Sequence, residues 1–314
     1  MLIQLDQIQK KETEEYQNCV TSKPIVSVCI QTYQHVAYIR QCLESVLMQK
    51  IACEYEILLG EDESTDGTRE ICLEYAEKYP EKIRLFLHNR ENVIFINGQA
   101  SGRFNLLYNL SNARGKYIAL LEGDDYWTDP EKLQKQVKFL KNNLDYIICF
   151  HPVMIEKEHK KFTDYITRDV DLRTNTLDLA AGNYIHTVSV MFRNINFQNF
   201  PKMFFKTFIG DLPLYLYLSQ YGDVRKLEFT GAVYRVHAKG RWSLISAVEK
   251  IDKTIRCLEF LLNYFSTKKD VFNVLFYNWR NLNRERFKDI SLCPGKSSIK
   301  ELIKYYNYII ITNN

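Results

Sequence analysis

The sequence predicts an α/β fold in which a mostly parallel sheet is flanked by helices and followed by a helical, aromatic-rich C-terminal extension. Through the first half of the chain, short apolar runs alternate with segments that carry apolar residues at helical spacing. Short polar loops join these segments, as in sheets whose parallel strands are connected by right-handed helical crossovers. From Ala247 onward, Leu, Phe and Tyr recur at helical spacing with Lys and Arg between them, which indicates helices.

The composition is that of a globular protein. With 314 residues the chain has room for one large domain or two smaller ones, and no apolar run has the length of a transmembrane helix. Eight cysteines are scattered without a CxxC pair, so neither a disulfide framework nor a zinc site is indicated. The first residues lack the pattern of a signal peptide. These features predict a cytoplasmic protein.

Charge and aromatic content narrow the classes of partner. The net charge of +4 comes from lysines and arginines spread along the chain, which argues against nucleic acid as a partner. The 21 tyrosines and 18 phenylalanines suit either a large aromatic core or surfaces on which sugar rings and bases stack. The aromatic C-terminal segment suits either helical packing or contact with a membrane surface, and both interpretations stay open.

The elements follow in order from local patterns. Residues 1–22 form a polar arm that Leu2, Leu5 and Ile8, at helical spacing, make capable of forming a helix. The predicted strands lie at residues 25–30, 55–59, 83–87, 116–121, 146–153, 185–193 and 226–236. The predicted helices lie at residues 36–49, 69–78, 104–113, 132–142 and after Asp211. Between His88 and Arg103 no element is predicted.

Three carboxylates, Glu122, Asp124 and Asp125, directly follow the fourth predicted strand. Ligands of open parallel sheets bind at the carboxyl ends of strands, and clustered carboxylates repel one another unless a cation or hydrogen-bond donors hold them. The cluster therefore suggests a divalent metal that holds a phosphorylated ligand. It is also typical of a turn that introduces a helix, with Asp129 as N-cap and Pro130 at the first helical position. The two interpretations are compatible.

A second acid pair, Glu61 and Asp62, ends the second predicted strand, where an acid can accept hydrogen bonds from a base N–H or a ribose hydroxyl. The following segment, residues 64–67, has turn and cap chemistry, so Asp66 is predicted to be structural. No GxGxxG follows the first strand and no GxxxxGK[ST] occurs anywhere. A dehydrogenase site and a P-loop site are therefore disfavoured.

Two residues in the second half of the chain each allow a structural and a functional interpretation. His186 lies at one end of a predicted strand, where a histidine is more often a structural group than a ligand. Asp211 precedes Pro213 at the start of an apolar helix. It serves there either as an N-cap or as a carboxylate that faces a pocket and takes up a proton.

Six short motifs between residues 24 and 243 together resemble the family-two glycosyltransferases of the GT-A fold, bacterial enzymes that build surface polysaccharides. The motifs are residues 27–34, 61–68, 114–118 with 122–127, 186–187 with 192–193, 210–211, and 234–237. Gln31 replaces the usual proline of the first motif, and Glu61 and Glu63 replace the first Asp and the first Gly of the second. Each motif alone is weak, but six in sequence order are specific.

The resemblance implies a nucleotide site and a metal site. The residues that would hold the nucleotide of a UDP-sugar are Thr32, Tyr33, Glu61, Asp62 and Asp124. Asp124 and Asp125 would share the ribose and a Mg²⁺ or Mn²⁺ cofactor, with Asp125 as the first choice for the metal. Glu122 stands where the family has its first Asp, so it would reach the metal directly, through water, or not at all. His237 is a further candidate ligand.

For catalysis, the resemblance implies that Asp211 is the general base, which removes a proton from the acceptor hydroxyl as that oxygen attacks the anomeric carbon. Attack from the face opposite the leaving group inverts the anomeric configuration. His186 would contact the acceptor, and Arg235 and Arg241 would lie over the diphosphate with His237.

The function so implied is inverting, metal-dependent sugar transfer from a UDP-sugar to a saccharide or lipid-linked saccharide acceptor. The alternatives are a non-catalytic nucleotide- or saccharide-binding module of the same fold and a metal-dependent nucleotidyl transferase. The expected organisation is an arm (1–22), a catalytic domain (23–243) and a helical extension (244–314), with nucleotide and acceptor halves at 23–153 and 154–243. Peripheral contact with the inner face of the cytoplasmic membrane and homo-oligomerisation stay open.

Overall fold

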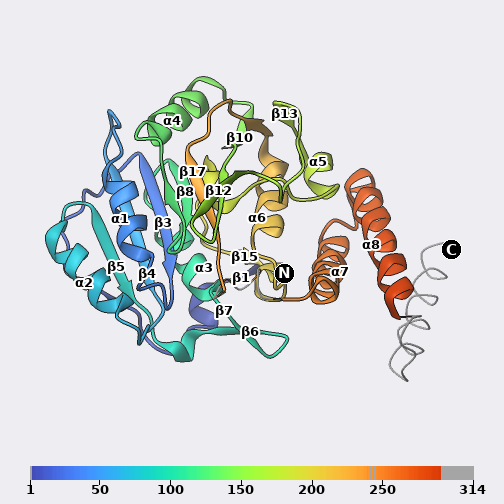
Figure 1. The fold of residues 1–314 in the computed structure, drawn as a ribbon, viewed down its shortest axis with the longest axis horizontal. Coiled ribbons are helices and arrows are strands. Elements are labelled where there is room, and N and C mark those ends of the chain that lie inside the picture. Colours follow the sequence, from blue (N-terminus) through green and yellow to red (C-terminus); the bar gives the residue numbers. More distant parts are fainter. Residues whose placement is uncertain (1, 239, 241, 243–244, 291–314) are drawn as a thin grey trace. The chain divides into compact units, whose positions relative to one another are not determined.

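The computed structural model describes residues 2–238, 240, 242 and 245–290, and has a large mixed sheet flanked by helices (Figure 1). The chain divides into two compact units, residues 1–244 and 245–314. The described strands of the main sheet follow in the order β13 (Arg173–Thr174), β16 (Asp223–Lys226), β10 (Tyr146–Phe150), β14 (Met191–Arg193), β8 (Tyr117–Glu122), β3 (Val26–Thr32), β4 (Tyr55–Glu61), β5 (Ile83–Leu87) and β2 (Glu14–Glu15). The predicted fold class is confirmed.

The middle of this sheet is parallel. Strand β3 pairs in parallel with β4 on one side and with β8 on the other, and β4 pairs in parallel with β5. Both faces are covered, so every residue of β3 and β4 is buried. Because the strands are parallel, their carboxyl ends meet at one edge, which brings the residues after β3, β4 and β8 together.

Helices cover the two faces of the sheet. The helices α1 (Ile39–Leu47), α2 (Thr68–Lys78) and α4 (Lys132–Asn142) share one apolar core with Val26, Val28 and Ile30. Helix α3 (Arg103–Asn112) packs on β3 and β4 and donates side-chain hydrogen bonds to the main-chain oxygens of Gly60 and Ile30. Successive side chains of a strand point to opposite faces, so Cys29 and Gln31 face the α3 side.

A smaller sheet joins the acid cluster to the second half of the chain. Its strands follow in the order β12 (Lys160–Thr163), β11 (Met154–Lys157), β17 (Ala232–Val236) and β9 (Tyr126–Trp127). Strand β9 directly follows the acids and pairs with β17 through Tyr126 and Val233. The turn that carries Asp124 and Asp125 is thereby held beside Arg235 and His237.

The N-terminal arm differs from the expected helix-capable segment. It contains β1 (Leu2–Ile3), a short 3₁₀ turn (Leu5–Gln7) and β2, and β2 adds an antiparallel edge strand to β5. The buried guanidinium of Arg84 donates hydrogen bonds to the Glu15 carboxylate, at 2.8 Å and 3.2 Å. Pairing with a sheet edge outweighs the weak local preference for helix.

Three predicted strands end earlier or divide. The strand predicted at 185–193 is a 3₁₀ turn (Thr187–Ser189) followed by β14, and the strand predicted at 146–153 stops at Phe150. The segment 226–236 contributes to β16 and β17, which belong to different sheets. An apolar run identifies burial but not the sheet that buries it, which explains these errors. Helix α4 begins at Lys132, so Asp129 and Pro130, the predicted N-cap and first helical residue, both lie before the helix.

The stretch before α3 forms a β-hairpin, β6 (Ile94–Ile96) and β7 (Gln99–Ser101). Its two turn residues, Asn97 and Gly98, both have positive φ, at 53° and 76°. An Asn-Gly pair between two short strands is a strong signal for this turn, and the sequence analysis did not use it. The hairpin leads directly into α3.

The second unit consists, as far as it is described, of α7 (Ala247–Tyr264) and α8 (Lys269–Ile290), which pack against each other. Ser246 caps α7 by accepting a hydrogen bond from the Glu249 N–H, and Arg286 of α8 pairs with Asp252 of α7 at 2.6 Å. Across the described ranges, no helix has the length and apolar character required to cross a membrane.

Candidate active site

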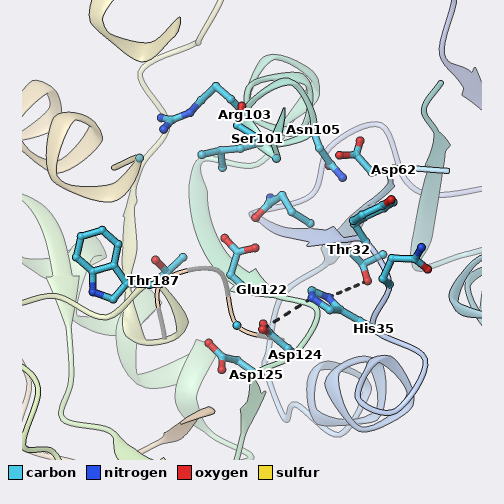
Figure 2. Close-up of a pocket in the computed structure, with 18 of the residues that line it drawn as sticks. Thr32, His35, Asp62, Ser101, Arg103, Asn105, Glu122, Asp124, Asp125 and Thr187 are labelled. Atoms are coloured by element: carbon cyan, nitrogen blue, oxygen red, sulfur yellow. Dashed lines mark hydrogen bonds and ion pairs between the residues drawn. The ribbon is translucent and has the colours of Figure 1, made fainter. Parts of the chain in front are cut away.

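A cavity of about 580 Å³ lies at the carboxyl edge of the parallel strands (Figure 2). Its wall comes from the ends of β3, β4 and β8, the β6–β7 hairpin, the start of α3 and the segment before α6 (Asp211–Leu218). The predicted site residues that line it are Thr32, Tyr33, Asp62, Glu122, Asp124, Asp125 and Arg235. The structure thus brings the residues after three separate strands to one cavity.

The acids after β4 have different surroundings. Glu61 is fully buried, and its carboxylate pairs with Arg69 and accepts hydrogen bonds from the main-chain N–H groups of Glu63 (3.2 Å) and Ser64 (2.7 Å). It does not line the cavity. Asp62 does, with Arg90 at 3.5 Å from its Oδ2. Of the two acids predicted to contact the nucleotide, only Asp62 therefore lines the cavity, while Glu61 stabilises the loop that follows it.

The cavity wall next to Asp62 is aromatic and cationic. The guanidinium carbon of Arg90 lies 4.1 Å from the centre of the Tyr33 ring. Thr32 Oγ1 and His35 Nδ1 are 3.2 Å apart, which links the end of β3 to the loop before α1. Arg90 and His35 were not predicted as site residues. Both lie in loops whose approach to the cavity depends on packing between segments distant in sequence.

Asp124 is held by two histidines. Its Oδ2 lies 2.9 Å from His237 Nε2 and 3.8 Å from His35 Nε2 (Figure 2 shows His35 and Asp124). Burial acts to raise the pKa of Asp124, but the hydrogen bond from His237 and the neighbouring His35 outweigh it, and the pKa lies below its usual value. Asp124 is therefore a carboxylate at neutral pH.

Asp125 is buried, with 1% of its surface exposed. Its Oδ1 accepts a hydrogen bond from the Arg235 main-chain N–H at 2.8 Å, whereas Oδ2 has no hydrogen-bond partner. Burial, and after it the charge of Asp124, raise the pKa of Asp125 well above its usual value. A buried carboxylate oxygen without a partner beside a second carboxylate is a position that a cation would stabilise.

A divalent cation fits these donors. No group of three or more His, Cys, Asp or Glu side chains converges as a complete metal site in the described part of the chain. The carboxylates of Asp124 and Asp125 are the kind of donor that Mg²⁺ and Mn²⁺ prefer, and the imidazole of His237 lies beside them, with Nε2 2.9 Å from Asp124 Oδ2. Glu122 also lines the cavity. Phosphate oxygens of a ligand and water would have to complete the coordination shell.

Asp211 is the first residue of α6 and not its N-cap, which is Gly210. Its Oδ2 accepts a hydrogen bond from Asn183 Nδ2 at 2.7 Å, and its Oδ1 accepts one from the Leu212 N–H at 2.8 Å. Burial raises the pKa of Asp211, although the main-chain N–H of Leu212 and the charge of Arg103 act in the opposite direction. The preceding Gly210 and Arg103 line the cavity, so Asp211 lies beside its wall.

The remaining predicted residues have other partners or lie outside the described residues. His186 Nε2 is 2.9 Å from Asp164 Oδ2, and its ring lies 5.0 Å from that of Tyr234. The Arg235 guanidinium donates to Glu156, to Gln41 and to the main-chain oxygen of Asp124. Arg241 is outside the described residues.

Arg103, which the sequence analysis did not single out, is a buried cation of the wall. Its guanidinium donates to the main-chain oxygen of Thr207 at 3.0 Å and joins α3 to the segment before α6. A Cβ added to Gly210 would lie 2.9 Å from this guanidinium, so a larger residue at this position would require Arg103 to shift. Arg103 lies two residues after strand β7 of the β6–β7 hairpin. A prediction of this hairpin from its Asn-Gly turn would have indicated where Arg103 lies.

The fold defines a protein of the GT-A type, an α/β sheet whose carboxyl edge carries the acids Glu122, Asp124 and Asp125 in one cavity. The profile of "Glycosyl transferase family 2" matches residues 27–200, and the chain belongs to this family.

Two relatives are similar to this chain in sequence. An uncharacterized protein of Mycobacterium bovis is 36% identical over 223 residues, which are 69% of this chain and 60% of the relative. This chain thus spans less than two thirds of that relative's length. The "Putative teichuronic acid biosynthesis glycosyltransferase TuaG" of Bacillus subtilis is 38% identical over 118 residues, 38% of this chain and 42% of the relative.

Two solved structures share the fold. S. aureus TarS (residues 1–349) in complex with UDP-GlcNAc aligns over 87% of this chain and 76% of its own, with a TM-score of 0.59 and 16% identity. The mannosyltransferase PcManGT of Pyrobaculum calidifontis, in complex with GDP-Man and Mn²⁺, aligns over 98% of this chain and 86% of its own. The TM-score is 0.53 and the identity is 15%. At these identities the likeness concerns the fold.

Proposed function

We propose that the protein is an inverting, metal-dependent glycosyltransferase that moves a sugar from a UDP-sugar to a saccharide or lipid-linked saccharide acceptor. One observation carries the proposal. Asp62, Asp124 and Asp125 line a single cavity, and Asp211, a carboxylate with a raised pKa, directly follows Gly210 in the wall of that cavity. The carboxylates proposed to bind the nucleotide and the metal thus lie near the carboxylate proposed as the base.

The nucleoside would bind at the Tyr33 end of the cavity. The Tyr33 ring with Arg90 supplies a stacking surface, and Asp62 supplies an acceptor for a base N–H or a ribose hydroxyl. The UDP-GlcNAc complex of TarS supports a nucleotide sugar as the ligand class.

Asp124, Asp125 and His237 would hold the divalent metal. When bound, such an ion neutralises the charge that develops on the diphosphate as it leaves. The unpartnered Oδ2 of Asp125 supports this assignment, as does the Mn²⁺ in the PcManGT complex. The contacts of Arg235 and His237 keep both acids in place before the ligand arrives.

Asp211 would act as the general base. Its raised pKa makes it a better proton acceptor than an ordinary aspartate, and the Asn183 and Leu212 donors fix the orientation of the carboxylate. The acceptor oxygen loses its proton to Asp211 and forms the bond to the anomeric carbon as the bond to the diphosphate breaks. Attack from the opposite face inverts the configuration.

The biological setting proposed is surface-polysaccharide synthesis, which the name of the TuaG relative supports. Residues 23–153 would bind the nucleotide sugar and residues 154–243 the acceptor, with His186 in the acceptor half. A lipid-linked acceptor would bring the protein to the inner face of the cytoplasmic membrane as a peripheral protein.

A thermal-shift screen of nucleoside diphosphates and nucleotide sugars, with and without Mn²⁺, tests the proposal. Ligands that bind the folded state raise its Tm by mass action, so UDP and one or more UDP-sugars should raise it most when Mn²⁺ is present. NMR of the transfer product should show the inverted anomer. Absence of binding, hydrolysis and transfer across the panel would refute the proposal, and binding without turnover would favour a non-catalytic module.

A further inference from the structure

Gln31, the residue that stands where relatives usually have proline, has a buried carboxamide without a partner. The residue is 5% exposed and lines the cavity, yet neither Oε1 nor Nε2 makes a hydrogen bond. Leaving a buried donor and a buried acceptor unpaired destabilises the folded protein. In native proteins such groups are rare and often mark a functional site.

Neighbouring carboxamides have partners. Asn105 Nδ2 donates to the main-chain oxygen of Gly60 at 2.8 Å, and Asn109 Nδ2 donates to that of Ile30 at 3.0 Å, although Asn109 Oδ1 accepts no hydrogen bond. Gln31 differs from both in that its donor and its acceptor are unpaired together. Away from the cavity, the buried Gln136 donates from Nε2 to the Ser189 oxygen at 2.8 Å and accepts from the Lys132 ammonium at 2.7 Å. The fold therefore satisfies a buried glutamine elsewhere but not at the cavity.

The position of Gln31 indicates which part of a ligand it would meet. In the sheet it lies between Gly60 of β4 and Glu122 of β8. Its side chain is on the α3 side, opposite that of Thr32, and α3 carries Arg103 beside Gly210. Gln31 lines the same cavity as Tyr33, at the proposed nucleoside end, and as Gly210, the residue that precedes Asp211, so a sugar held in this cavity would meet it.

We propose that Gln31 is a specificity residue that reads hydroxyl groups of the donor's sugar, and this proposal rests on the proposed function. Oε1 accepts a hydrogen bond from one hydroxyl, and Nε2 donates to an oxygen next to it. Neighbouring sugar hydroxyls offer this donor and acceptor pair, because each hydroxyl can do both. A buried group that is paired only by the ligand disfavours analogues that lack the matching hydroxyl.

The experiment uses the full chain with Gln31→Met, which keeps the length of the side chain and removes both polar atoms. Gln136→Met is the matched control, because its carboxamide is paired. Without ligand, Gln31→Met should keep or raise the Tm, whereas Gln136→Met should lower it. Affinities for UDP and for the tightest-binding UDP-sugar are then measured by calorimetry with Mn²⁺.

The expected result is that Gln31→Met keeps UDP affinity within about twofold and loses about tenfold or more in affinity for the UDP-sugar. Removal of the matching hydroxyl from the sugar should weaken binding to the wild type but not to the variant. Equal loss for UDP and UDP-sugar would assign Gln31 to the nucleotide and overturn the proposal. So would a lowered Tm with unchanged sugar affinity, since that marks a structural residue.

The wild-type measurements separate this proposal from the proposed function. If the wild type binds no nucleoside diphosphate and no nucleotide sugar, both fail. If the wild type binds and transfers sugar while Gln31→Met discriminates among UDP-sugars as the wild type does, only the role of Gln31 is refuted.

Discussion

The main-chain N–H of Arg235 donates a hydrogen bond of 2.8 Å to Asp125 Oδ1, which ties β17 to the acid turn after β8. The Arg235 guanidinium adds hydrogen bonds to Glu156 Oε1 at 3.1 Å and to the main-chain oxygen of Asp124 at 2.6 Å. Its guanidinium carbon lies 4.3 Å from the centre of the Tyr126 ring. Arg235 therefore holds the turn that presents the acids to the cavity.

Substitution Arg235→Met should lower stability by roughly 2–3 kcal/mol, because it leaves Glu156 without its buried partner. It should also weaken Mn²⁺-dependent nucleotide binding, since the acid turn loses its support. Chemical denaturation and calorimetry measure the two effects. Arg40→Met is the matched control: the Arg40 and Glu74 side chains are 50% and 52% exposed, and an ion pair in water contributes little to stability. Equal losses in both variants would contradict this role.

Substitution Asp211→Asn should reduce transfer by roughly 10²–10⁴-fold while leaving UDP affinity nearly unchanged, because only the proton acceptor is removed. Transfer is measured by release of UDP and binding by calorimetry. The exposed Asp145→Asn provides the control, and it should retain full transfer. Loss of both UDP binding and transfer in Asp211→Asn would indicate that Asp211 is a structural residue.

The raised pKa of Asp211 predicts two pH effects. Its base form is lost as pH falls, so the acid limb of the kcat/KM profile should lie above the ordinary aspartate value of 3.8.

The second effect concerns the stability of the folded protein, which is favoured by the protonated form of Asp211 and not by the base form. The folded state binds this proton more tightly than the unfolded state does. Stability therefore falls as pH rises from the unfolded pKa through the raised folded pKa. Asp211→Asn removes this penalty, so its Tm should exceed that of the wild type at neutral pH, and the difference should vanish near pH 3. A constant difference across this range would contradict the assignment.

The metal assignment predicts that chelation with EDTA weakens UDP binding and that Mn²⁺ restores it. Asp125→Asn should lose this metal-dependent increment, roughly tenfold or more in affinity. In metal-free buffer the same variant should be as stable as the wild type or more so, because it removes the repulsion between Asp124 and Asp125. Glu122→Gln is the comparison for the third acid, and an unchanged metal dependence there would exclude it as a direct ligand.

Experiments should distinguish the roles of Glu61 and Asp62, the two acids at the end of β4. Glu61→Gln should lower stability by roughly 1–3 kcal/mol, because Arg69 and two main-chain N–H groups lose a charged acceptor, while UDP affinity stays close to that of the wild type. Asp62→Asn should weaken UDP binding by roughly 10–100-fold with little change in Tm. The reverse pattern would assign the nucleotide contact to Glu61.

Much of the fold was predictable because its elements are encoded locally. The apolar runs at residues 25–30, 55–59 and 83–87 predicted β3, β4 and β5, and alternation with helical spacing predicted parallel pairing. The prediction of one strand at 226–236 was wrong, because apolar character alone does not show that Lys226 and Ala232 belong to different sheets. The prediction for the N-terminal arm was wrong because its strand β2 pairs with the edge of β5, which is distant in sequence.

The α/β alternation and the positions of Asp62, Asp124 and Asp125 at strand ends could be read from the order of apolar and acidic residues along the chain. What each side chain contacts depends on how the chain packs. Glu61 pairs with Arg69 across a loop, Arg235 supports the acid turn, and the carboxamide of Gln31 has no partner. Such assignments depend on distances between segments far apart in the chain, and these distances arise when helices and strands pack into one core.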